Sequence, residues 1–351
     1  MISARLLNLV RCPECRMPVA GRPGEPFLLA CSACGRAYRG ANGYLDMRPA
    51  EAFSEQTKYL DEALHADARH ERVSPPLLGS RIRNDMLRRF LRLSPEDLVI
   101  DLGCGSGRAL LWNRDLGAAA MGVDISPFFS TDARREMDLL LGDLRRLPFA
   151  EGTFTKAWSL DVLEHLSPEA LQAMLAEAAR ILKPGGGLFV YTHVRKNAPV
   201  AIGLRWINAL AHRLERADLI DGRQERLRKS DHQNPLADIP ELEAVARRAG
   251  FRLAKIRYYT PIVGGFVENI LVRLAERAMA RRAAGRLPAS LPAAEIGAAA
   301  IREARSSAKA RIAGSPTTYA ALRGLSWLMK IDLLLFGRIR SGPFFALLVK
   351  E

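Results

Sequence analysis

The 351-residue chain is predicted to fold as a doubly wound α/β protein with a small cysteine-rich module at its start. Apolar segments typical of buried strands alternate with helical segments between residues 98 and 192, and several of these strands end in Asp. The first strand runs into a turn with three alternate glycines before a helix begins. Two Cys-x-x-Cys pairs precede this region, within the first 34 residues.

The glycine-rich turn predicts a cofactor site. Leu98, Val99 and Ile100 read as a buried strand, and the glycines that follow let the backbone turn tightly against a ligand because no side chain obstructs it. A dinucleotide fingerprint requires G-x-G-x-x-G, but Arg108 stands where the third glycine is needed. The turn therefore favours a nucleotide-like cofactor other than NAD.

Further strand ends carry acidic side chains. A strand over 118–124 ends at Asp124, about twenty residues after the glycines, the interval at which a carboxylate meets ribose hydroxyls. A third strand ends at Asp143. The other expected elements are a helix over 106–116, a strand over 154–161, a helix over 168–182, a turn over 183–187 and a strand over 188–192.

The pattern D-x-G-x-G-x-G resembles motif I of the class I S-adenosylmethionine-dependent methyltransferases, and the resemblance extends from about Asp97 to Tyr259. It implies a Rossmann-like domain with a seven-stranded sheet and S-adenosyl-L-methionine as cofactor, with Asp143 and Leu144 beside the adenine. The residues that it places against the cofactor are Asp101, Gly103, Cys104, Gly105, Gly107, Asp124, Ile125, Asp143, Leu144 and Leu160.

The cysteine pairs, Cys12-x-x-Cys15 and Cys31-x-x-Cys34, have the spacing of a zinc ribbon over residues 1–48. Four thiolates complete a tetrahedral structural zinc site, which leaves no position open for catalysis. The alternatives are disulfides, disfavoured in a reducing cytoplasm, and a ribbon without metal. The segment resembles the small zinc-ribbon activators of tRNA and release-factor methyltransferases and the ribbon of a bacterial 23S rRNA guanine methyltransferase, and such ribbons do not by themselves fix the substrate.

Residues 49–96 are expected to form a helical linker that covers the cofactor. Tyr59, Arg81 and Arg83 are candidate pocket residues there, and the alternative is a solvated helix face.

Catalytic candidates follow the fourth strand, in SLDVLEHL, where Asp161, Glu164 and His165 have helical spacing. The run resembles the D-x-x-E-H segment of methyltransferases that act on quinone precursors, so His165 is a candidate general base beside Glu164. Two alternatives stay open. The three side chains bind a divalent metal ion, or Glu164 caps the next helix while His165 packs under the cofactor.

A second catalytic candidate, His193, follows the fifth strand, because the ends of strands four and five flank the acceptor pocket in this architecture. Tyr191 and Thr192 lie beside it in the sequence. A loop histidine is also commonly just solvated.

The rest of the chain divides into a core and two insertions. The methyltransferase-like core is expected over 97–260 with a cap insertion at about 195–237, and its reversed last strand over 341–351. Between them, 261–340 forms a basic, amphipathic helical insertion. From residue 251 onward the chain has 17 Lys and Arg against 6 Asp and Glu, so most of the net charge of +14 lies there. These helices either contact an anionic membrane surface or only pack on the sheet.

Composition favours a folded, cytoplasmic protein. No apolar run reaches the roughly 18 residues of a membrane-spanning helix, and the apolar stretch at the start of the chain is too short for a secretory signal. The helices of 261–340 allow a peripheral position on the inner face of the membrane.

Two classes of acceptor compete. A small hydrophobic or lipid-linked molecule is favoured by the aliphatic helices and by LDVLEHL in place of an N/D-P-P-Y-type motif. Methylation of rRNA or tRNA is the alternative, favoured by the ribbon and the positive charge. A protein substrate and a non-catalytic, cofactor-binding partner protein are further alternatives.

Overall fold

The computed structural model describes residues 2–21, 27–50, 73–195, 202–222, 226, 232–284, 307–308, 312, 314–340 and 342–351. Tyr59, part of the expected lid and parts of both insertions lie outside these residues.

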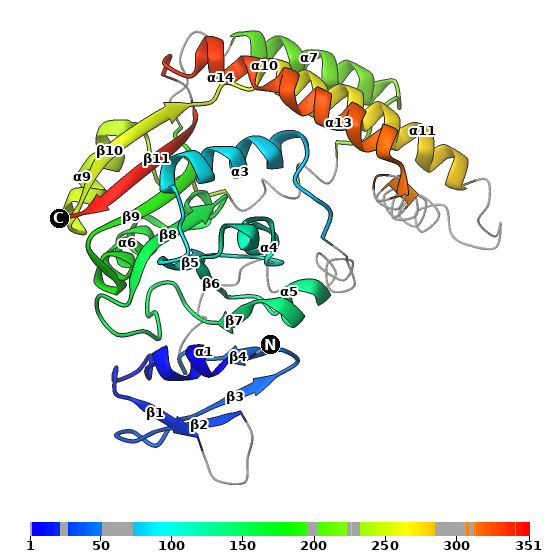
Figure 1. Ribbon diagram of the computed structural model, residues 1–351. Helices are drawn as coiled ribbons and strands as arrows, with labels where there is room; N and C mark the ends of the chain where they lie inside the picture. Colours follow the sequence, from blue (N-terminus) through cyan, green and yellow to red (C-terminus); the bar gives the residue numbers. More distant parts are fainter. Residues whose placement is uncertain are drawn as a thin grey trace.

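One continuous sheet of eleven strands organises the described chain, in the order β1-β2-β3-β4-β7-β6-β5-β8-β9-β11-β10 (Figure 1). The strands are β1 (Val19–Gly21), β2 (Leu28–Cys31), β3 (Ala37–Ala41), β4 (Tyr44–Asp46), β5 (Leu98–Leu102), β6 (Ala119–Asp124), β7 (Asp138–Leu141), β8 (Phe154–Leu160), β9 (Leu182–His193), β10 (Phe251–Tyr258) and β11 (Pro343–Lys350).

The central strands β7, β6, β5, β8 and β9 are parallel, which confirms the strands expected from the apolar segments. Strand β11 runs antiparallel between β9 and β10, so the reversed last strand is also confirmed. The expected turn over 183–187 is wrong, because β9 includes these residues and the β8–β9 register shifts between Phe154 and Lys156.

The count of seven strands is wrong for this sheet. Strand β4 pairs in parallel with β7, with Leu45 opposite Leu140, so the four strands of the N-terminal module extend the sheet. An edge strand exposes unpaired backbone groups, and β4 supplies partners to those of β7. Strands β5 to β11 come from residues 98–350, and the other four come from the first 46 residues.

Helices cover both faces of the sheet, as expected for a doubly wound fold. The N-terminal and core helices are α1 (Ala4–Leu9), α3 (Leu78–Leu91), α4 (Arg108–Asn113), η3 (Arg114–Leu116), α5 (Thr131–Glu136), η4 (Leu163–His165), α6 (Pro168–Ile181) and α9 (Ile239–Arg248). Buried side chains of α6 and α9 share one core with one face of the strands, and those of α3, α4 and α5 share a second core with the other face.

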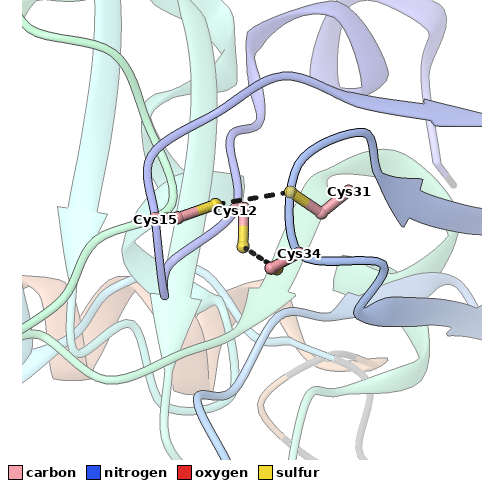
Figure 2. A group of neighbouring side chains, drawn as sticks. All are labelled: Cys12, Cys15, Cys31 and Cys34. Atoms are coloured by element: carbon pink, nitrogen blue, oxygen red, sulfur yellow. Dashed lines mark hydrogen bonds between the residues drawn. The ribbon is translucent and has the colours of Figure 1, made fainter.

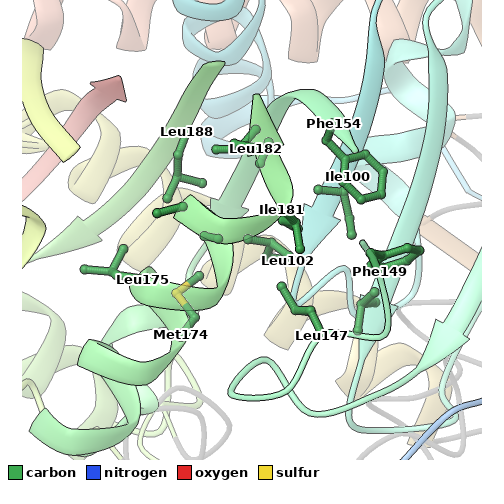
Figure 3. Close-up of a cluster of buried hydrophobic side chains, with 14 of the residues drawn as sticks. Ile100, Leu102, Leu147, Phe149, Phe154, Met174, Leu175, Ile181, Leu182 and Leu188 are labelled. Atoms are coloured by element: carbon green, nitrogen blue, oxygen red, sulfur yellow. The ribbon is translucent and has the colours of Figure 1, made fainter. Parts of the chain in front are cut away.

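The alternation of side chains along β5 shows why both faces are apolar. Ile100 and Leu102 point into the core under α6, whereas Val99 points into the core under α3. Figure 3 shows part of the first core, where Phe149 and Phe154 pack edge-to-face with ring centroids 4.9 Å apart. The strands are therefore held from both sides, which fixes the positions of their carboxyl ends.

A layer of helices from the two insertions lies at one end of the molecule (Figure 1). Its members are α7 (Ile202–Arg216), α10 (Ile262–Phe266), η6 (Val267–Val272), α11 (Arg273–Ala284), α13 (Pro316–Met329) and α14 (Ile331–Phe336). Helix α10 contacts α7, α13 and α14, and α13 packs on α3. Ser326 Oγ and Glu268 Oε1 accept hydrogen bonds from the backbone N–H groups of Leu78 and Gly79, which ties the layer to the first turn of α3.

Candidate functional site

The site is built where four parallel strands end. Because β5, β6, β8 and β9 are parallel, their carboxyl ends lie at one edge of the sheet, the usual place for ligands in doubly wound folds. Asp124 and His193 are the last residues of β6 and β9, and Gly103 and Asp161 directly follow β5 and β8.

The glycine turn after β5 has the backbone that only glycine adopts without strain. Gly103, Gly105 and Gly107 have φ of +83°, +53° and +80°. A Cβ on Gly103 would lie 2.4 Å from Val162 Cγ2, and one on Gly107 would lie 2.6 Å from Ala133 Cβ. A Cβ on Gly105 would meet nothing within 4 Å. The turn is thus closely packed at Gly103 and Gly107 and open at Gly105, where a ligand can approach the backbone.

Asp124, at the end of β6, faces this turn. Its Oδ2 accepts a hydrogen bond from the Gly105 N–H at 2.7 Å, and its Oδ1 accepts one from the Ser126 N–H at 2.9 Å. Burial raises the pKa of Asp124, and the backbone N–H groups of Ser126, Gly105 and Ile125 oppose that rise. A carboxylate has about four acceptor sites, so Asp124 can still accept a hydrogen bond from a ligand hydroxyl. Ile125 is half-buried beside it.

Asp143 follows β7, on the far side of β6, and lies buried against Arg145. Its carboxylate accepts hydrogen bonds from the Arg145 N–H at 2.9 Å and from Arg145 Nη2 at 2.8 Å. A ligand at this carboxylate therefore has to share it with the guanidinium. Leu144 and Leu160 are both half-buried, Leu144 beside Asp143 and Leu160 at the end of β8.

The side chains of Asp101 and Cys104 are both buried beside the glycine turn. Burial raises the pKa of Asp101 to about 8. Burial also raises the pKa of the Cys104 thiol, whose Sγ would lie 2.6 Å from a Cβ on Gly122. The Cys104 side chain belongs to the core under α3, so only its backbone is available at the turn.

A polar cluster gathers at the ends of β8 and β9. Glu164, only 3% exposed, accepts a hydrogen bond from Thr192 Oγ1 at 2.8 Å, and its Oε1 lies 4.0 Å from His193 Nδ1. Burial and the nearby charge of Asp161 raise the pKa of Glu164 to about 7. The edge thus brings the catalytic candidates Glu164, His165 and His193 together.

The structure separates Asp161 from the other candidates. Residues 163–165 form a single 3-10 turn, η4, and Asp161 precedes it with φ +56°, so the expected single helical face is wrong. The Asp161 carboxylate instead lies 3.6 Å from Arg83 Nε, whose guanidinium carbon is 5.4 Å from the centre of the Tyr191 ring. Helix α3 therefore brings Arg83 to this edge, whereas Arg81 pairs with Asp85 on the same helix.

The suggestion that Glu164 caps the next helix is also wrong. The N-cap of α6 is Ser167, whose side chain accepts the hydrogen bond from the Ala170 N–H.

His232 also belongs to this cluster, although the sequence did not predict it. Its ring centroid lies 4.6 Å from that of His165 and 5.3 Å from that of His193. The backbone N–H groups of Gln233 and Asn234 both donate to the Glu164 carbonyl at 2.9 Å, which pins this segment to η4. No spacing in the sequence signals the contact, because the segment lies far along the chain.

The four N-terminal cysteines lie together, as Figure 2 shows. Cys12 Sγ is 3.6 Å from Cys34 Sγ, and Cys15 Sγ is 3.4 Å from Cys31 Sγ, with all four sulfurs within 4.8 Å of one another. A disulfide needs about 2.05 Å. Four sulfurs around a zinc ion at about 2.3 Å are roughly 3.8 Å apart. The cysteines are unbonded, and their sulfurs lie close enough together to share one metal ion.

Known proteins are similar to this chain over the segment that forms these strand ends. Residues 100–190 match the family model described as a methyltransferase domain. This segment is a methyltransferase domain. It contains the glycine turn, the ends of β5, β6, β7 and β8, and the Glu164–His165 pair.

Curated relatives match mainly over this domain. An uncharacterised methyltransferase of Synechocystis is 34% identical over 27% of this chain and 47% of its own length. A demethylmenaquinone methyltransferase of Mycolicibacterium vanbaalenii is 36% identical over 29% of this chain and 45% of its own. A probable tRNA methyltransferase 9B of Mus musculus is 30% identical over 36% of this chain and 30% of its own. The chain thus spans less than half the length of these relatives.

Proposed function

We propose that the protein is an S-adenosylmethionine-dependent methyltransferase that methylates a small, hydrophobic or lipid-linked acceptor. The observation that carries the proposal is the shared edge, where an open glycine turn and an acidic strand end lie beside a buried glutamate–histidine cluster. The glycine turn and the acidic strand end are suited to binding a nucleoside, and the glutamate–histidine cluster is suited to proton transfer.

The residues at the edge fit the cofactor. The open space beside Gly105 admits a ligand close to the backbone, and the acceptor-only carboxylate of Asp124 at this turn suits ribose hydroxyls, which donate. The remaining cofactor contacts that we propose are those of Asp101, Gly103, Cys104 through its backbone, Gly107, Ile125, Asp143, Leu144 and Leu160. Asp101, with its pKa near 8, is kept ionised best by a nearby cation, and the donor carries both a sulfonium and an ammonium group.

When bound, the cofactor supplies an electrophilic methyl group, and an acceptor lone pair displaces the thioether sulfur, which retains the electrons of the broken C–S bond. The protein then has to orient the acceptor and take up its proton. His193 is suited to this role, because Glu164 Oε1 lies 4.0 Å from its Nδ1 and stabilises the protonated ring. Thr192 holds the other oxygen of Glu164 and so fixes the carboxylate.

The helical layer supports an apolar acceptor. Large apolar side chains are exposed on it, among them Trp206 and Trp327, each 72% exposed, and Leu334, 77% exposed. Several such side chains on one layer are consistent with contact with an apolar partner. The layer is joined to α3, and α3 carries Arg83 to the reaction edge.

The same layer supports a peripheral membrane contact on the cytoplasmic side. The exposed side chains of Arg323, Arg338 and Arg340 belong to the same segment as Trp327 and Leu334, the mixture that binds anionic lipid surfaces. No helix in the described part of the chain is long and apolar enough to span a bilayer.

We also propose that the four cysteines hold one structural zinc ion. Four ligands fill its coordination sphere, and the ribbon then stabilises the N-terminal strands that extend the sheet through β4. The ribbon and the net charge of +14 favour RNA methylation as the second candidate function.

The experiment that separates these functions uses methyl-labelled S-adenosylmethionine. The purified chain is incubated with the labelled donor and a cell extract, and lipid, small-molecule, RNA and protein fractions are then counted. We expect label in the lipid or small-molecule fraction. Label in RNA favours the second candidate function, and label in no fraction contradicts methyl transfer.

A further inference from the structure

We infer that Glu164, His165 and His232 form a divalent-cation site at the acceptor side of the edge. One ligand atom from each lies within 4.8 Å of the other two. Two imidazoles and one carboxylate are a ligand set used by zinc enzymes and by sites for Fe(II), Co(II) and related ions. The set differs from the sequence hypothesis, since His232 takes the place of Asp161.

The chain builds this site from two segments that are distant in sequence. Glu164 and His165 lie on η4, and His232 begins the segment that leads to α9. Two backbone hydrogen bonds to the Glu164 carbonyl hold that segment in place, and Arg195 Nη1 adds a third contact by donating to the Asn234 carbonyl at 2.8 Å. The approach of His232 to His165 is therefore fixed by the backbone.

Burial of Glu164 strengthens the argument. A buried carboxylate is costly unless it is paired, and in the described part of the chain the Glu164 side chain contacts Thr192 at 2.8 Å and His193 at 4.0 Å, with the charge of Arg83 acting from farther away. A divalent cation compensates a buried carboxylate better than a hydroxyl does. The nearby amide Oδ1 of Asn234 is also buried, and it has no hydrogen-bond partner among the described residues.

The geometry requires only small adjustments. Bonds of about 2.0–2.2 Å to three ligands place neighbouring ligand atoms about 3–3.5 Å apart. The three atoms are at most 4.8 Å apart, and His165 and His232 are half-buried, so rotations of their rings close the difference. Three protein ligands leave positions open, as in catalytic rather than structural metal sites.

The open positions suggest what the cation does, and this step rests on the proposed methyl transfer. A divalent cation that binds an acceptor hydroxyl lowers its pKa and makes the oxygen a better nucleophile. The hydroxyl proton then passes to His193, and the oxygen forms a bond to the donor methyl carbon as the C–S bond breaks and the sulfur keeps its electron pair. The inference therefore favours oxygen acceptors.

The test is a titration of the zinc-loaded full chain with Co²⁺, in which near-ultraviolet and visible absorption is recorded after each addition. Imidazole and carboxylate ligands give Co²⁺ weak d–d bands, whereas the cysteine site would add intense sulfur charge-transfer bands. We expect one Co²⁺ per chain without charge-transfer bands, and at least tenfold weaker binding in Glu164→Gln and in His232→Asn. His212→Asn is the matched control, because His212 lies exposed on α7, outside the cluster.

Three results would overturn the inference: no Co²⁺ bound beyond the cysteine site, charge-transfer bands alone, or unchanged affinity in both cluster variants. If Glu164→Gln fails to fold, His232→Asn decides, because its ring is not buried. S-adenosylmethionine binding is measured on the same samples. A chain that binds Co²⁺ but not the donor contradicts the proposed function and leaves the cation site standing.

Discussion

Replacing Asp124 tests the cofactor site most sharply. In the structure its two oxygens accept hydrogen bonds from the backbone of Gly105 and Ser126 at 2.7 and 2.9 Å. Asp124→Asn keeps one oxygen and the shape of the side chain, but it removes the charge and leaves one of the two backbone N–H groups without its acceptor, whereas Asp124→Ala leaves both without one. The Asn variant therefore removes the carboxylate with the smaller disturbance of the turn, and the Tm of both variants reports that disturbance.

The expected magnitude follows from the hydrogen bonds to the ribose. A bond to a charged acceptor contributes about 1.5–3 kcal/mol and a neutral one about 0.5–1.5 kcal/mol, so two ribose bonds lose about 2 kcal/mol in total. This loss corresponds to roughly a 30-fold higher Kd for S-adenosylmethionine in Asp124→Asn. Asp124→Ala should weaken binding by at least tenfold and also lower the Tm, because the turn loses its acceptor.

Isothermal titration calorimetry with S-adenosylmethionine measures both variants. The matched control is Asp115→Asn, on η3, where the exposed carboxylate pairs with Arg88 away from the edge. Its Kd should equal that of the wild type. A Kd for Asp124→Asn within twofold of the wild type would refute the assignment of this carboxylate to the ribose.

Three further perturbations follow from the structure. Replacing Cys31 and Cys34 by Ser should release about one zinc ion per chain and lower the Tm, and a metal-free wild type in elemental analysis would contradict this. His193→Gln should reduce turnover at least a hundredfold with unchanged donor affinity, and near-normal turnover would remove His193 from proton transfer. Asp97→Asn should lower the Tm at pH 7, because Asp97 accepts a hydrogen bond from Lys156 Nζ at 2.7 Å. Burial raises the pKa of Asp97, but the hydrogen bonds from Lys156, Ser94 and Thr155 outweigh burial, so the pKa is lowered overall. The Tm difference between the wild type and Asp97→Asn should therefore shrink as the pH falls below about 4, where Asp97 becomes protonated. A Tm difference that does not change with pH would contradict this cause.

The strands and the cofactor edge were predictable because their signals are local. The apolar run to Asp101 and the alternate glycines specify a buried strand and a turn from within one short segment. The order of strand, turn and helix then fixes which strand ends meet, because parallel crossovers obey few topologies. The same locality made the cysteine cluster predictable from its spacing.

The rest depended on contacts between distant segments. The pairing of Leu45 with Leu140 joins the ribbon to the sheet over only two residue pairs, too short a ladder to leave a pattern in the sequence. The departure of Asp161 from the cluster depends on a positive φ in a non-glycine residue, which residue type does not indicate. His232 joins Glu164 through backbone hydrogen bonds, and these carry no side-chain signal.

The most direct test of the proposed function is a crystal structure of the chain with S-adenosylhomocysteine. We predict that the ribose lies on Asp124, that the glycine turn contacts the ligand above Gly105, and that the sulfur faces Glu164 and His193. A ligand bound elsewhere, or one whose sulfur points away from this cluster, would contradict the proposal that donor and acceptor meet at this edge of the sheet.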